Sequence, residues 1–133
     1  MNIKNFADEL AAVEIPGVYE RLTAIPRELD TRRLPSQFVD MPQVTITPGA
    51  VFGTMAEAGG QYAATLYIAQ SRVTDGGVTD EQRACVLELA AEVEAWAKTT
   101  PYTVLILTAP RIPVGAVEYR GVTARITADE DID

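Results

Sequence analysis

Apolar residues near the start of the chain recur every three or four positions, which is the spacing of one face of an α-helix. They predict a helix over residues 3–14, with the stripe Ile3, Phe6, Leu10 and Val13. Pro16 and Gly17 interrupt this pattern, and the same spacing then resumes. We therefore predict a second helical piece over residues 16–25, because proline is well tolerated at the first position of a helix.

The clearest helix of the sequence is predicted over residues 79–98. Thr79 and Gln82 match a capping box, in which each side chain satisfies a free backbone N–H of the other residue. A continuous apolar stripe follows the cap, and Pro101 limits the helix at its far end. The stripe consists of Val86, Leu89, Ala90, Val93, Trp96 and Ala97.

Four other segments alternate apolar and polar residues, or are short and aliphatic, and these patterns predict β-strands. The predicted strands cover residues 44–47, 61–72, 102–108 and 114–127. Residues 26–42, which begin and end with proline, predict a long irregular connection. Turn and breaker residues separate the strands at Pro48-Gly49, Asp75-Gly76-Gly77, Pro110 and Pro113.

The order helix, strands, helix, strands predicts an α+β domain. We expect two layers, with two main amphipathic helices packed on a largely antiparallel β-sheet of about four strands. A chain of 133 residues is long enough for one core, so we predict a single domain over residues 1–128 and an acidic tail over 129–133. The predicted core is Phe6, Leu10, Leu22, Leu66, Ile68, Val86, Leu89, Val93, Trp96, Leu105 and Ile126.

Composition and charge exclude several classes of protein. With 47% apolar and 23% charged residues, the chain has an ordinary soluble globular composition. Its net charge of −8 argues against sequence-specific binding of nucleic acid. It also argues against binding to an anionic membrane surface. Residues 1–5 begin no apolar signal core, and the apolar run at 104–107 is too short to span a bilayer, so we expect an intracellular protein.

The remaining candidates for chemistry each have a simpler structural interpretation. The chain has no histidine, which removes the usual base for a serine or cysteine nucleophile. Glu88 and Glu92 lie four positions apart but have no third group, so a solvated helix face is favoured. Cys85 is the only cysteine, and a small buried residue is favoured over a reactive thiol. We therefore predict no catalytic residue, no cofactor and no metal, in a protein that is not an enzyme.

Three features instead indicate contacts with other protein molecules. An arginine cluster lies within residues 26–42 of an otherwise acidic chain, and it is either a solvated loop or a contact with an acidic partner surface, since arginine pairs well with carboxylates. The same segment is long for a connection in a small domain. The strands at 61–72 and 114–127 exceed the usual length of about five or six residues. The predicted interface residues are Arg27, Arg32, Arg33, Tyr67, Arg72, Arg120 and Arg125.

The order of elements resembles that of the tail-terminator proteins of long-tailed bacteriophages, also described as tail-completion or neck proteins. An N-terminal helix, an irregular loop, a strand pair, a second helix and closing strands correspond in order to residues 2–25, 32–46, 61–72, 79–98 and 102–127. Within this order, residues 34–46 (LPSQFVDMPQVTI) enter the first strand through a proline, as such proteins do.

The resemblance implies a structural virion protein that forms a ring, commonly hexameric, and caps the tail tube. Its partners would be other copies of itself, the tail-tube protein and the head-completion or neck proteins, with DNA passing through the lumen. It also implies a location in the virion tail and neck, and in the host cytoplasm during assembly. The alternatives are another head–tail connector or baseplate protein, and a cellular α+β domain that binds a small ligand.

Overall fold

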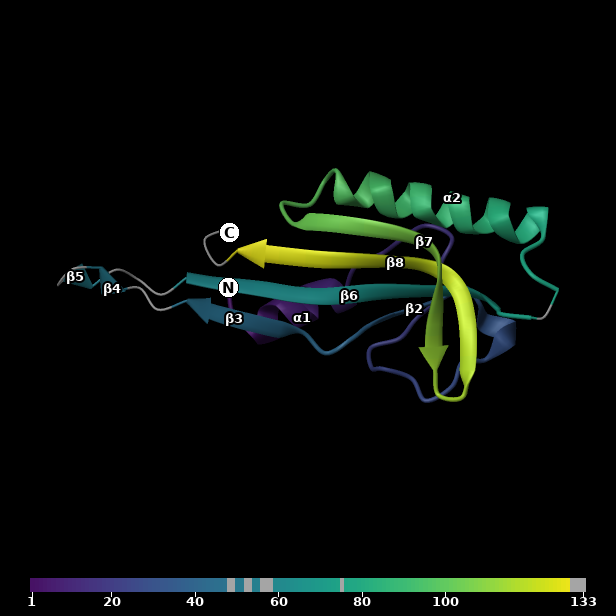
Figure 1. The fold of residues 1–133 in the computed structure, drawn as a ribbon, viewed down its shortest axis with the longest axis horizontal. Helices are drawn as coiled ribbons and strands as arrows, with labels where there is room; N and C mark the ends of the chain where they lie inside the picture. Colours follow the sequence, from purple (N-terminus) through teal and green to yellow (C-terminus); the bar gives the residue numbers. More distant parts are fainter. Residues whose placement is uncertain (48–49, 52–53, 56–58, 75, 130–133) are drawn as a thin grey trace.

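The computed structural model of the chain describes residues 1–47, 50–51, 54–55, 59–74 and 76–129. Within these ranges the α-helices are α1 (Ile3–Ala11) and α2 (Asp80–Ala97), and a 3₁₀ turn covers Thr31–Arg33. The fold is therefore α+β, as predicted (Figure 1). The strands are β1 (Glu20–Arg21), β2 (Ser36–Val39), β3 (Gln43–Thr47), β4 (Ala50–Val51), β5 (Thr54–Met55), β6 (Gly59–Arg72), β7 (Thr103–Val114) and β8 (Val117–Asp129).

The centre of the sheet is the antiparallel pair of β6 and β8. The strand order is β1-β2-β6-β8-β7, and β3 also pairs with β6, which makes a six-stranded sheet in the described part of the chain. All of its strand pairs are antiparallel except β1 with β2. Beyond the helices, the hairpin of β3 and β6 leads to the separate antiparallel pair β4–β5 (Figure 1).

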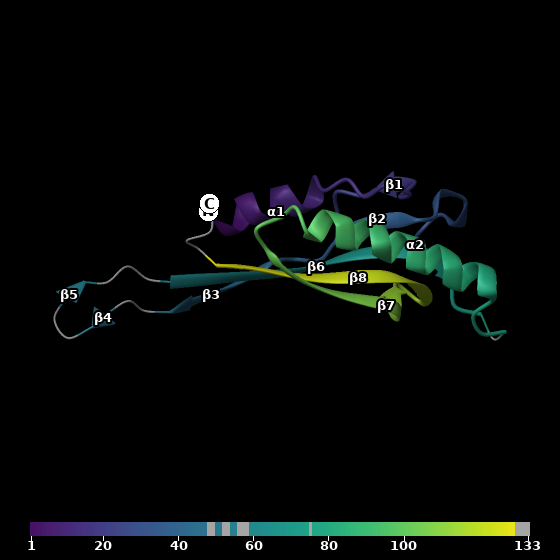
Figure 2. The ribbon, with the colours of Figure 1, turned by 90° about the horizontal axis from the view of Figure 1, so that it is seen from above.

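The main hydrophobic core lies between the helices and one face of the sheet. Side chains that alternate along β6 and β8, such as Leu66 and Ile126, are buried there with Phe6 of α1 and Val93 of α2. Both helices lie on the same side of the strands (Figure 2). The hydroxyl of Tyr102, just before β7, also donates a hydrogen bond to the Glu9 carboxylate of α1. Packing and this hydrogen bond together hold α1 on the sheet.

A second, smaller core lies on the opposite face of the sheet, at one end. There the tip of the β7–β8 hairpin and the chain around Leu29 bury Phe38, Ile112, Val114 and Tyr119. The hairpin reaches this position because both of its strands bend sharply (Figure 1). The two-layer description is therefore correct for only part of the molecule.

The segment predicted as a second helix, residues 16–25, forms strand β1 and its flanking turns. Gly17 adopts a positive φ of 94°, and the N–H groups of Tyr19 and Glu20 donate to the carbonyl of Pro35. The N–H of Leu22 donates to the carbonyl of Gln37 at 2.8 Å. Pairing with a distant strand thus satisfies the backbone groups that a helix would have paired locally. The helix prediction is wrong because this tertiary pairing prevails over local spacing.

The predicted irregular connection at 26–42 contains the 3₁₀ turn and strand β2. Strand β2 pairs with β6 in antiparallel orientation, and the register places Ser36 opposite Ala69 and Val39 opposite Leu66. The prediction of about four strands is wrong mainly because β1 and β2 are too short to show an alternating pattern.

The last part of the sheet is a hairpin whose turn differs from the predicted one. Strand β7 continues past Pro110 and through Pro113 to Val114, with a register shift between Thr108 and Arg111. Proline is tolerated because β7 is an edge strand. The chain reverses at Gly115, where φ is +61° and an added Cβ would lie 2.4 Å from the Arg27 carbonyl oxygen.

Most of the predicted core is buried, with one clear exception. Leu105 is 56% exposed, because it points away from the helices, and its assignment to the core is wrong. Leu22 and Trp96 are partly buried, and the other predicted core residues are buried. The capping box of Thr79 and Gln82 is confirmed.

Three of the predicted turn and tail segments lie partly or wholly outside the described residues. Asp129 is the last residue of β8, and residues 130–133 of the predicted tail lie outside. The same is true of Pro48-Gly49 and of Asp75. In the described part of the chain, no helix has both the length and the apolar character needed to cross a bilayer.

Replacing Phe6 by alanine should lower the free energy of unfolding by about 3–5 kcal/mol. Phe6 has no exposed surface, and its ring centroid lies 5.6 Å from that of Tyr62 and 5.7 Å from that of Tyr102. Tyr19→Ala, at a side chain that is 70% exposed, is the control and should change it by about 0.5 kcal/mol or less. Urea unfolding measures both, and equal losses would place Phe6 outside the core.

Candidate interaction surface

On the sheet face opposite the helices, one part lies outside the second core and meets it only at its inner border. Its side chains come in two rows across the strands, Thr65–Arg125–Leu105 and Tyr67–Thr123–Leu107. We call these six residues the open sheet face. They alternate with buried or partly buried residues of β6, β7 and β8, so they point away from α1 and α2. Leu105, Leu107 and Arg125 are exposed, Thr65 and Tyr67 are partly buried, and Thr123 is buried. Of the six, only Arg125 is charged.

The open sheet face presents two large aliphatic side chains to solvent. Leu105 is 56% and Leu107 51% exposed, and both stand on β7. Because β7 ends the strand order, its outer edge pairs with no other strand that the structure describes. Adjacent exposed leucines on an unpaired edge strand are typical of a surface that contacts another protein.

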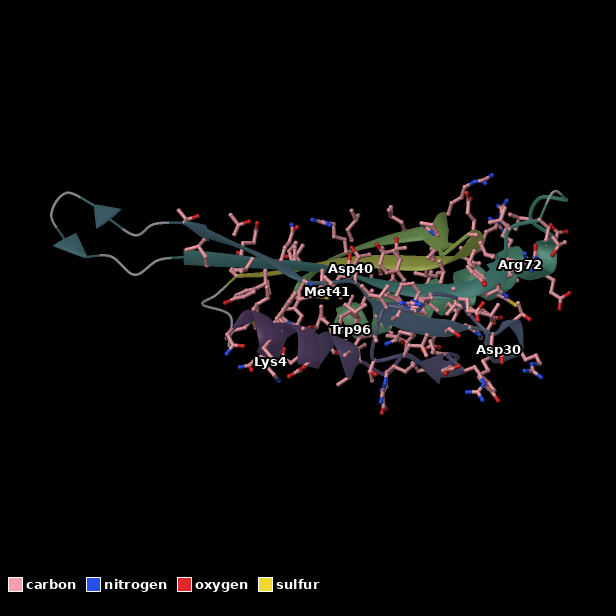
Figure 3. The ribbon with its side chains drawn as sticks, turned by 90° about the horizontal axis from the view of Figure 1, so that it is seen from below. Lys4, Asp30, Asp40, Met41, Arg72 and Trp96 are labelled. Carbon is pink, nitrogen blue, oxygen red and sulfur yellow. The ribbon has the colours of Figure 1, made fainter. Side chains whose placement is uncertain are left out.

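Tyr67 forms the inner border of the open sheet face. Its ring stacks on Phe38 of β2 with centroids 5.1 Å apart, which joins this face to the second core. The nearby Asp40 carboxylate accepts a hydrogen bond of 2.8 Å from the backbone N–H of Thr65. Partial burial, and then the negative charge of Asp40, raise the pKa of the Tyr67 phenol. Asp40 and Met41 lie near the middle of the long strands (Figure 3).

The predicted arginine cluster makes ion pairs within its own part of the chain. Arg32 lies 3.2 Å from Asp30, and Arg33 lies 3.5 Å from Glu20. Hydrogen bonds from Arg32 hold the pKa of the Asp30 carboxyl below its usual value. The Arg32 side chain nevertheless remains 88% exposed, so its guanidinium can pair with a second carboxylate.

The seven predicted interface residues do not form one site. Tyr67 and Arg125 belong to the open sheet face. Arg72 lies with Asp30 at the end of the molecule farthest from β4 and β5 (Figure 3). Arg120 stands opposite Ser71, next to Arg72 in the same strand pair, and its Nε is buried without a hydrogen-bond partner in the described structure. Arg27 is exposed, beside the hairpin turn at Gly115.

The acidic and thiol candidates of α2 line one shallow cavity. Cys85, Glu88 and Glu92 border a space of about 370 Å³, together with Gln70 and Pro35. Cys85 is partly exposed, which differs from the buried position favoured by its sequence context. In the described ranges, no group of three or more acidic or cysteine side chains is arranged to hold a metal ion.

The chain matches no protein-family model, no curated protein and no solved structure. The geometry of the surface and the resemblance in element order are therefore the grounds for any functional proposal.

Sequence reasoning found Arg125 and Tyr67 but missed the two leucines as surface residues. Residues 104–107, Val-Leu-Ile-Leu, are apolar on both faces of the strand, so alternation does not tell which face is buried. The partner strand holds the useful signal. Arg125 and Thr123 mark the polar side of β8, and Leu105 and Leu107 stand opposite them in register.

Replacing Asp40 by asparagine should lower the pKa of Tyr67, because a nearby negative charge disfavours the phenolate. The pKa should stay above that of a free tyrosine, since burial is the larger cause of the shift. Tyrosinate absorbance during an alkaline titration measures this, with Tyr67→Phe identifying its contribution among the five tyrosines. A Tyr67 titration unchanged in Asp40→Asn would exclude the electrostatic contact.

Proposed function

We propose that this protein is a structural component of a bacteriophage tail, whose copies form a ring that caps the tail tube and joins the tail to the head or neck. The observation that carries the proposal is the open sheet face, with Leu105 and Leu107 exposed beside Arg125. A protein with this function acts through contacts between folded chains and needs no bound cofactor. Its identity as a tail protein rests on the resemblance in element order.

The apolar surface favours assembly over an isolated monomer. Each Å² of apolar surface that is removed from water stabilises a complex by about 25 cal/mol. Association of copies through the exposed leucines is therefore favourable. Strands β6 and β8 each pair with neighbouring strands along both of their backbone edges. Another chain can therefore contact these two strands only through their side chains. The backbone edge that another chain can reach on the β8 side is that of β7.

The charge of the chain is suited to a ring through which DNA passes. Each copy contributes −8, and a lumen with this sign repels phosphates and does not retain DNA. The same charge makes copies repel one another, so local pairs of opposite charge are needed where they meet. Exposed arginines such as Arg32 and Arg125 are suited to form such pairs.

The described side chains favour contact over catalysis. Glu88 and Glu92 have no histidine or lysine beside them in the cavity that they line. The cavity is shallow and bordered by the prolines and glycine of the residue 16–35 region. In the part of the chain that the structure describes, the Cys85 thiol and the two carboxylates line this cavity without a basic group that would activate the thiol, so the cavity carries no catalytic proposal.

The proposal predicts that association strengthens as salt is raised. The Debye length falls from ~10 Å at 0.1 M to ~3 Å at 1 M salt, which reduces repulsion between acidic copies. Sedimentation velocity at several protein concentrations gives the mass of the assembly at each salt concentration. Weaker association at high salt would show that attractive ion pairs, and not self-repulsion, control assembly.

The double variant Arg32→Glu, Arg33→Glu should lose assembly or docking on the tail tube while its monomer stays folded. The reversal replaces two exposed cations of this segment by carboxylates, which repel Asp30 and Glu20. Electron microscopy of tail tubes with added protein, together with far-ultraviolet circular dichroism, measures both properties. Wild-type-like rings and capped tubes from this variant would contradict a role of the loop, and a wild-type protein that stays monomeric on tubes would contradict the ring.

A further inference from the structure

The open sheet face lacks a covering layer that the opposite face of the same sheet has. On the opposite face, α2 packs its residues Val86, Leu89 and Val93 against the strands. The open sheet face presents Leu105, Leu107 and a single charge, that of Arg125. A sheet with apolar residues on both faces is stable in water when each face is covered by another element.

The outward side of α2 has the properties that such a cover requires. It carries Ala84, Glu88, Ala91 and Ala95, which are spaced three or four residues apart and are all exposed. The alanines allow a close approach between this helix and a flat surface. Glu88 is the carboxylate among them, and residues 80–97 as a whole carry five acidic side chains against one basic side chain.

We propose that the outward side of α2 of one copy covers the open sheet face of the next copy, with Glu88 pairing with Arg125 across the contact. The inference rests on the proposed ring and specifies how its copies meet. The alanines would lie on Leu105 and Leu107, so each copy gains a second helical layer from its neighbour. The ion pair would fix which side of the helix faces the sheet.

Charge complementarity within this one chain favours a second copy as the occupant. Arg125, the one charged residue among the six, is positive, and the helix that could cover it is negative. The Asp40 carboxylate lies at the border of the face, where it accepts a hydrogen bond from Thr65. The two surfaces lie on different sides of one domain, because α2 packs on the face opposite to Arg125. A contact of this kind is head-to-tail and repeats from copy to copy, as ring assembly requires.

Charge reversal tests the contact, because the two partners are on different copies. Arg125→Glu alone should weaken association by about tenfold or more, because two carboxylates then face each other across the contact. Glu88→Arg alone should weaken association to a similar extent, because two guanidinium groups then face each other. An equimolar mixture of the two variants should restore association, because every contact then joins opposite charges. Sedimentation velocity measures the assembled mass of each sample.

The matched control exchanges an ion pair on α1. Lys4 and Asp8 lie 2.7 Å apart and are exposed, so Lys4→Glu with Asp8→Arg reverses one charge of each sign and preserves the pair. This variant should assemble as the wild type does. Circular dichroism on all variants confirms that each chain is folded before association is compared.

Each outcome decides the inference. Restored association in the mixture, with neither single variant assembling, supports the contact. If Arg125→Glu assembles like the wild type, the contact is wrong while the ring itself stands. If Arg125→Glu forms rings but no longer caps tubes, the occupant is the tube protein and the second-copy assignment is overturned. A wild-type protein that is monomeric both alone and on tubes overturns the proposed ring as well.

Discussion

The pairing of β6 with β8 is the interaction on which the rest of the structure depends. The two strands pair from Gln61 opposite Asp129 to Arg72 opposite Tyr119, and every other strand of the main sheet is attached directly or indirectly to them. Because side chains alternate along a strand, this register places Leu66 with Ala124 toward the helices and Thr65 with Arg125 away from them. One register therefore determines both the main core and the open sheet face.

A local irregularity in this pairing divides the second face into a covered and an uncovered part. The register of β6 with β8 shifts between Ala69 and Ser71, and that of β7 with β8 shifts at nearly the same level of β8. At Gly121 the strands approach so closely that an added Cβ would lie 1.8 Å from the carbonyl oxygen of Ile68. Bulges bend strands, so the hairpin tip turns over the second core and leaves Leu105 and Leu107 uncovered.

Long periodic patterns predicted the parts of the fold that local sequence determines. The capping box of Thr79 and the apolar stripe of α2 are local features, and so is the alternation along β6. The short strands β1 and β2 were not predictable in this way, because they form by pairing with distant segments. The prolines of β7 predicted a break in the strand. Strand β7 nevertheless continues, because it lies at the edge of the sheet, where a proline without an N–H group is tolerated. The orientation of Leu105 depended on the register with Arg125, which a single strand does not encode.

The central claim is that the open sheet face becomes buried when copies assemble. A thiol placed there by Leu107→Cys, in a Cys85→Ala background, reports this burial directly, because Cys85 is the only natural cysteine. The rate of maleimide labelling, measured from dilute to concentrated protein, follows the accessibility of the thiol. The account predicts that labelling slows as the assembled fraction rises. A labelling rate that is equal in the monomer and in the assembled protein would contradict it.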